Sequence, residues 1–170
     1  MQWSYEQLEC LLSGEKLSER CLSETSYRTI CVGLERDLKL KSRIEWCHYG
    51  SGYASYVDAW FSPTGQPGSG LVVLLSRLSH YFVMMQGSKS WSKGQLAASS
   101  YLPHSSMTDQ FEDPEISKLV GPVQRVLEGH GLIRLDAADL DTPLPAGTQV
   151  ATILGDPPFT QWDALFYWED

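Results

Sequence analysis

Cys47 and His48 are the residues of this sequence whose types come closest to nucleophilic chemistry. A thiolate attacks well when an imidazole lies within hydrogen-bond reach and takes its proton. The two residues are adjacent in a segment with the periodicity of a strand, so their side chains point to opposite faces. Cys47 would therefore need His80, His104 or His130 as its base, and the pattern favours a buried cysteine beside an exposed histidine.

Other residue clusters that could carry chemistry do not have the spacing that such chemistry needs. No histidine pair has zinc-site spacing, and the cysteines do not cluster. Residues 65–70 are rich in glycine but lack the Gly-Lys-Ser/Thr ending of a phosphate-binding loop, which predicts a turn. Asp136, Asp139 and Asp141 lack the remaining ligands of a calcium loop, and Asp136 is expected to cap the short turn 137–140. We therefore expect no cofactor and no metal.

The ending of the chain, residues 160–170, alternates bulky aromatic side chains with carboxylates. Carboxylates pair with Lys and Arg, aromatic faces stack on the same cations, and Trp and Tyr are enriched at protein interfaces. The alternative is a core strand in which Trp162, Ala164, Phe166 and Trp168 face inward. The candidate partner-binding residues are Asp136, Asp139, Asp141, Asp156, Asp163, Tyr167, Glu169 and Asp170.

The net charge of −8 is concentrated in one part of the chain. Residues 1–104 have 10 Lys and Arg against 9 Asp and Glu, a balance of +1, whereas residues 105–170 have 3 against 12, a balance of −9. An acidic surface repels the phosphate backbone of nucleic acids and attracts a basic protein. We therefore expect a basic protein partner and no nucleic acid, although an acidic surface can also serve only solubility.

Neither the beginning of the sequence nor its cysteines indicate export. The first residues lack a basic segment followed by an apolar run, and the apolar stretches at 71–75 and 81–85 are shorter than the roughly 20 residues that cross a bilayer. Four cysteines without a CxxC pair favour free thiols in a reducing compartment. The sequence thus predicts a cytoplasmic protein with no membrane partner.

The elements that must position these residues follow from capping signals and periodicity. Caps at Ser4 and Ser23 predict an N-terminal helical hairpin, with Cys31 on the apolar stripe of its second helix. Asp113 predicts the start of one late helix. Alternating apolar residues predict strands near 43–48, 53–61, 71–75, 81–85, 132–135, 150–154 and 162–168. Residues 86–109 are expected to form either a long loop or a strand with irregular flanks. The expected fold is a single α+β domain, 1–170, in which the late helix packs on a central antiparallel sheet of about four to six strands.

The helical opening, the segment Gly-Leu-Ile-Arg-Leu-Asp-Ala-Ala-Asp-Leu at 131–140 and the ending Trp-Asp-Ala-Leu-Phe-Tyr-Trp-Glu-Asp resemble small bacterial immunity proteins of polymorphic-toxin systems. This resemblance implies a cytoplasmic protein that neutralises a cognate toxin by binding it, with no catalysis of its own. The expected function is a noncatalytic binding protein whose acidic C-terminal surface contacts a basic toxin. The alternative is a small enzyme or ligand-binding domain with an aromatic pocket that uses Cys47 or a histidine. A further alternative is a subunit of a larger assembly, for example a homodimer, that buries Trp168 and its neighbours in an oligomer.

Overall fold

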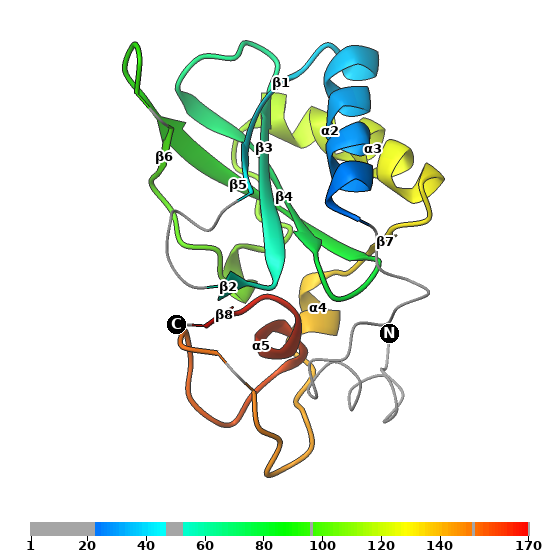
Figure 1. The fold of residues 1–170 in the computed structure, drawn as a ribbon, viewed down its shortest axis with the longest axis vertical. Helices are drawn as coiled ribbons and strands as arrows, with labels where there is room; N and C mark the ends of the chain where they lie inside the picture. Colours follow the sequence, from blue (N-terminus) through cyan, green and yellow to red (C-terminus); the bar gives the residue numbers. More distant parts are fainter. Residues whose placement is uncertain (1–22, 47–52, 96, 151, 170) are drawn as a thin grey trace.

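A six-stranded sheet is the centre of the α+β fold, in a computed structural model that describes residues 23–46, 53–95, 97–150 and 152–169 (Figure 1). The strands of this sheet are β1 Lys41–Glu45, β3 Tyr56–Ser62, β4 Gly68–Ser76, β5 Tyr81–Ser90, β6 Ala98–Ser99 and β7 Ile133–Arg134. Five of them follow the order β1-β3-β4-β5-β6 with antiparallel pairing throughout, as the predicted central antiparallel sheet required.

Strand β7 departs from the fully antiparallel sheet that the sequence predicted. It pairs parallel to β5, with Ile133 opposite Tyr81 and Arg134 opposite Phe82. Between β5 and β7 the chain runs through a helix that crosses one face of the sheet, and such a crossover returns the chain in its original direction. The sheet is therefore mixed.

Helix α2, Glu24–Leu38, confirms the second helix of the predicted hairpin. The Ser23 hydroxyl accepts a hydrogen bond from the Ser26 amide and so caps the first turn. The buried face of α2 includes Cys31, as its place on the apolar stripe predicted. The first helix of the predicted hairpin, after Ser4, lies outside the described residues. Within the part of the chain that the structure describes, no helix combines the length and the apolar character needed to span a bilayer.

Helix α3, Pro114–Gly129, is the predicted late helix, and it packs beside α2 on one face of the sheet (Figure 1). Asp113 caps it by accepting a hydrogen bond from the Glu115 amide, and Pro122 lies inside the helix without ending it. The strand residues beneath the two helices alternate along the sheet, as expected for one buried face: Val57, Ala59, Phe61, Leu71, Val73, Leu75, Phe82 and Met84.

The C-terminal segment covers part of the opposite face. Its elements are α4 Ala137–Leu140, α5 Gln161–Leu165 and β8 Trp168–Glu169, and β8 pairs with β2 Tyr53–Ala54. A short 3-10 helix, η2 Ser105–Met107, precedes α3. The strand residues on this second face are also apolar, among them Tyr56, Trp60, Val72, Leu74, Val83 and Met85. Because both faces are covered, β3 is buried along its whole length.

Two strands predicted near the end of the chain were wrong. Most of the ending 162–168 is not a strand, because Thr160 and Asp163 form a capping box that starts α5, and only Trp168 of this segment belongs to β8. Residues 150 and 152–154 contain no strand. In 86–109 the structure agrees with the alternative of a strand with irregular flanks, because β5 continues to Ser90 and pairs there with β6.

Candidate functional site

The C-terminal lobe, residues 135–150 and 152–169, concentrates negative charge in one region of the molecule. After Arg134 the sequence contains no Lys, Arg or His and has seven acidic residues. These residues are Asp136, Asp139, Asp141, Asp156, Asp163, Glu169 and Asp170. In Figure 1 the lobe forms the orange and red part of the chain below one end of the sheet. The acidic residues at the end of the sequence therefore lie in one region of the folded protein.

Ser55 fixes the lobe to the beginning of β3. Its hydroxyl donates to the Leu165 carbonyl oxygen at 2.6 Å and accepts from the Tyr167 amide at 2.9 Å. Its own amide donates to the Tyr167 carbonyl oxygen at 2.9 Å. Ser55 is fully buried, so these bonds form away from water. The lobe is consequently held in one orientation relative to the sheet.

Aromatic stacking adds to this attachment. The rings of Trp162 and Phe166 lie 5.0 Å apart, and Phe166 also contacts the Tyr56 ring at 6.0 Å. Both Trp162 and Phe166 are buried, as the alternative of an inward-facing ending expected. Tyr167 is only 7 % exposed and belongs to the same core cluster. Its position supports the packing of the lobe, since little of its side chain is available to a partner.

The carboxylates of α4 organise the lobe and also remain at its surface. Asp136 accepts a hydrogen bond from the Asp139 amide at 2.8 Å, and Asp139 accepts one from the Asp136 amide at 3.2 Å. This reciprocal capping box confirms that Asp136 starts the turn 137–140. Asp141 follows the helix as its C-cap, and both Asp136 and Asp141 are exposed.

The remaining candidate residues divide into three groups. Asp163 is half-buried and accepts hydrogen bonds from the Thr160 amide and hydroxyl at 2.7 and 3.2 Å. Asp156 is exposed on the loop that precedes α5. Asp170 and the side chain of Glu169 lie outside the described residues. The structure therefore places Asp136, Asp141 and Asp156 as exposed carboxylates of the lobe.

These three carboxylates have no cation paired with them in the described part of the chain. The ion pairs among residues 23–46, 53–95, 97–150 and 152–169 include none with Asp136, Asp141 or Asp156. The same lobe exposes apolar surface, since Ile153 is 52 % and Leu154 36 % exposed. A backbone hydrogen bond from Ile153 to Trp168 holds this loop against β8. Acidic and apolar groups are thus presented together on a fixed loop.

The structure describes three histidines that the catalytic alternative could use, and one cysteine, Cys31, that the sequence placed in the core. Burial, and to a lesser degree the negative charge of Glu35, raises the pKa of the Cys31 thiol to about 12, so this thiol is protonated near neutral pH. His104 caps η2 by accepting a hydrogen bond from the Ser106 amide. His130 lines a pocket of about 250 Å³ with the polar side chains of Thr25, Ser26 and Thr29. Cys47 and His48 lie outside the described residues.

Metal ligation has no candidate cluster in the described part of the chain. No group of three or more His, Cys, Asp or Glu side chains there could hold a metal ion. The carboxylates of α4 bond to backbone amides of their own turn instead.

A buried ion pair was not anticipated from the sequence. Asp58 and Lys89 are each 3 % exposed, with 3.9 Å between the Lys89 Nζ and an Asp58 oxygen. The Tyr101 hydroxyl donates to the same oxygen at 3.0 Å. Asp58, the single Asp within the apolar strand segment 56–62, could have predicted this pair, because a carboxylate at a core position needs a partner.

Comparison with protein-family models, curated protein sequences and solved structures gave no match. The residues and their arrangement are therefore the basis for assigning a function.

Proposed function

We propose that this protein is a noncatalytic binding protein that neutralises a basic protein partner by direct contact, as bacterial immunity proteins do with their toxins. The observation that carries the proposal is the charge of the C-terminal lobe: after Arg134 the sequence has seven acidic residues and no Lys, Arg or His. Asp136, Asp141 and Asp156 are exposed there without an ion-pair partner among the described residues. Their charge is available to a second molecule.

The lobe has the composition of a protein-binding surface. Interfaces combine an apolar centre with a polar rim, and a few anchors carry most of the affinity. Ile153 and Leu154 supply exposed apolar area, and Asp156 follows them on the same loop. A basic partner would meet an apolar contact bordered by carboxylates.

The attachment of the lobe favours tight binding. The Ser55 hydrogen bonds and the contact between the Phe166 and Tyr56 rings fix the lobe to the sheet before any partner binds. A surface that is already ordered loses less conformational freedom on binding. Concentrated charge of one sign also raises the rate at which an oppositely charged protein associates.

Affinity capture with charge-reversed variants tests this function. The tagged protein is incubated with lysate of its source cells, and bound proteins are identified and then released with increasing salt. We expect one basic partner in stoichiometric amount, inhibited in its own activity when bound. The variant Asp141→Lys/Asp156→Lys should lose this partner, whereas the control Glu112→Lys/Glu128→Lys, with the same change in net charge on and before α3, should retain it. Equal capture by both variants would contradict the proposal.

A further inference from the structure

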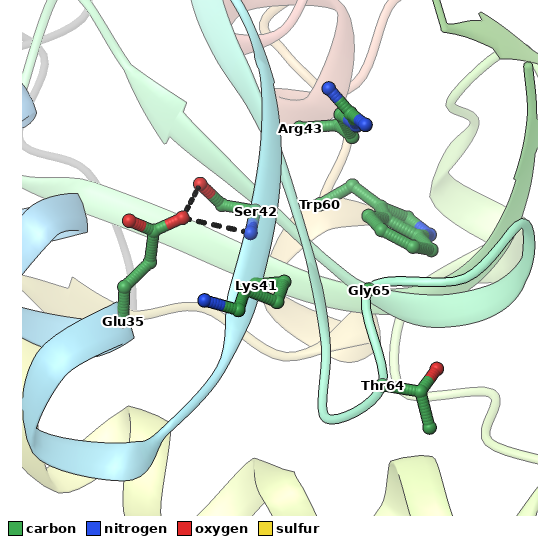
Figure 2. A pocket seen from close by; sticks show the side chains of 7 residues that line it. All are labelled: Glu35, Lys41, Ser42, Arg43, Trp60, Thr64 and Gly65. Atoms are coloured by element: carbon green, nitrogen blue, oxygen red, sulfur yellow. Dashed lines mark hydrogen bonds between the residues drawn. The ribbon is translucent and has the colours of Figure 1, made fainter. Parts of the chain in front are cut away.

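A pocket of about 330 Å³ lies at the end of the sheet opposite the C-terminal lobe. Glu35, Lys41, Ser42, Arg43, Thr64 and Gly65 line it, with the indole of Trp60 at its inner side (Figure 2). Lys41 pairs with Ser62 at the far end of β3, whereas the lobe is attached at the near end, beside Ser55. The pocket is therefore separate from the acidic surface.

Arg43 is held in this pocket by a stack of aromatic rings. Its guanidinium carbon lies 4.5 Å from the centre of the Trp91 ring. Trp91 meets Trp60 edge-on, with 5.6 Å between ring centroids and an interplanar angle of 84°. Trp60 is fully buried, and its indole N–H donates to the Gly87 carbonyl oxygen at 3.1 Å. The guanidinium group is planar, and stacking on a ring uses its face. The N–H groups at its edge can still donate hydrogen bonds.

The same arrangement occurs a second time in this protein, with its acceptor in place. The Arg28 guanidinium carbon lies 4.2 Å from the centre of the Trp46 ring. Its Nε and Nη2 donate to the Glu24 carboxylate at 3.1 and 2.7 Å. Arg43 makes no ion pair and no side-chain hydrogen bond with any residue that the structure describes. Compared with Arg28, the Arg43 stack has an open position for an oxyanion.

The charges around this position favour an anion. Lys41 lies two residues from Arg43 on β1 and also makes no ion pair with the described residues. Figure 2 shows its ammonium on the Glu35 side of the strand, away from the Arg43 guanidinium. The carboxylate of Glu35 lies across β1 and accepts hydrogen bonds from both the amide and the hydroxyl of Ser42 (Figure 2). The pocket therefore has two cations against one carboxylate that is already hydrogen-bonded.

We propose that this pocket binds a planar or tetrahedral oxyanion, a carboxylate or a phosphate, through the Arg43 guanidinium. The guanidinium fork can donate two parallel hydrogen bonds to either group. This site is independent of the proposed function, because it uses none of the residues of the C-terminal lobe.

Titration with sodium acetate and sodium phosphate, followed by NMR at constant ionic strength, tests this site. We expect the Arg43 Nε–H resonance and the Thr64 and Gly65 amides to shift and saturate, with a dissociation constant on the order of millimolar. The Arg28 Nε–H resonance should not move, because Glu24 already occupies its donors. Phosphate binding about tenfold tighter than acetate would indicate a phosphoryl ligand, and similar affinities would indicate a carboxylate.

Two variants and one matched control decide the outcome. Arg43→Gln should abolish the saturable shifts, and Arg43→Lys, which keeps the charge without the fork, should raise the dissociation constant about tenfold. Arg28→Gln should bind like the parent protein, and far-ultraviolet circular dichroism checks that each variant is folded. Shifts that follow sodium chloride equally well, or that persist at Thr64 and Gly65 in both Arg43 variants, would overturn the proposal.

Discussion

The hydroxyl of Ser55 donates a hydrogen bond of 2.6 Å to the carbonyl oxygen of Leu165, joining positions 110 residues apart in the chain. The same hydroxyl oxygen accepts from the Tyr167 amide. One buried side chain therefore satisfies two backbone groups of the lobe where the lobe meets the sheet. The orientation of the acidic surface depends on this junction.

Replacement of Ser55 by Ala should weaken this junction. Two buried backbone groups, the Leu165 carbonyl and the Tyr167 amide, would lose their partner, at a cost of about 2–4 kcal/mol in the free energy of unfolding. Urea denaturation measures the change, and Ser92→Ala, at an exposed position, is the control. An unchanged midpoint for Ser55→Ala would show that water or a local rearrangement replaces the bonds.

Two glycines should respond in opposite directions to replacement by Ala. A Cβ atom at Gly70 would lie 2.3 Å from the buried indole of Trp60 and 2.7 Å from the Phe61 carbonyl oxygen, so the side chain that orders Trp91 and Arg43 would have to move. Gly70→Ala should destabilise the protein by about 1–3 kcal/mol. Gly33 lies within α2, and a Cβ atom added there would meet nothing within 4 Å, so Gly33→Ala should stabilise by about 0.5–1 kcal/mol. Thermal unfolding of both variants checks the signs, and two shifts in the same direction would contradict this packing.

Cys31 should make stability fall in alkaline solution. Burial raises the pKa of this thiol from 9.0 to about 12 in the folded state. Between these pH values the unfolded chain releases the proton and the folded chain keeps it, so the unfolded state gains relative stability as pH rises. The contribution is complete below pH 9 and is lost at about 1.4 kcal/mol per pH unit above it.

Urea denaturation of the parent protein and Cys31→Ala between pH 8 and 10.5 isolates this effect, since other titrating groups cancel in the difference. We expect the gap between the two curves to narrow as pH rises. Curves that stay parallel over this range would mean that the thiol ionises equally in both states.

Local signals were sufficient to predict α2 and α3. Ser23 and Asp113 are capping residues directly before an apolar stripe, and both helices begin where these residues stand. The ending shows the limit of this approach. Its aromatic residues are buried almost throughout, so alternation could not distinguish strand from helix. The capping-box spacing of Thr160 and Asp163 was the signal that would have identified α5.

The sequence predicted the negative charge of the candidate site but not which of its side chains are exposed. The acidity after Arg134 is a property of the sequence, but the burial of Tyr167 depends on the packing of the lobe against β3. Arg43 lies on the edge strand β1, and Trp91 directly follows β5, so their stacking joins two segments far apart in the sequence. No local sequence pattern predicts such a contact. The exposure and the contacts of these side chains therefore depend on residues that are distant in the sequence and adjacent in the fold.

Association kinetics with the captured basic partner test the central claim most directly. The rate constant is measured for the parent protein, Asp141→Lys/Asp156→Lys and Glu112→Lys/Glu128→Lys over a range of salt concentrations. If the lobe is the contact surface, its variant should associate about tenfold more slowly at low salt and with a flatter salt dependence, while the control follows the parent. A lobe variant as fast as the parent at every salt concentration would contradict the account.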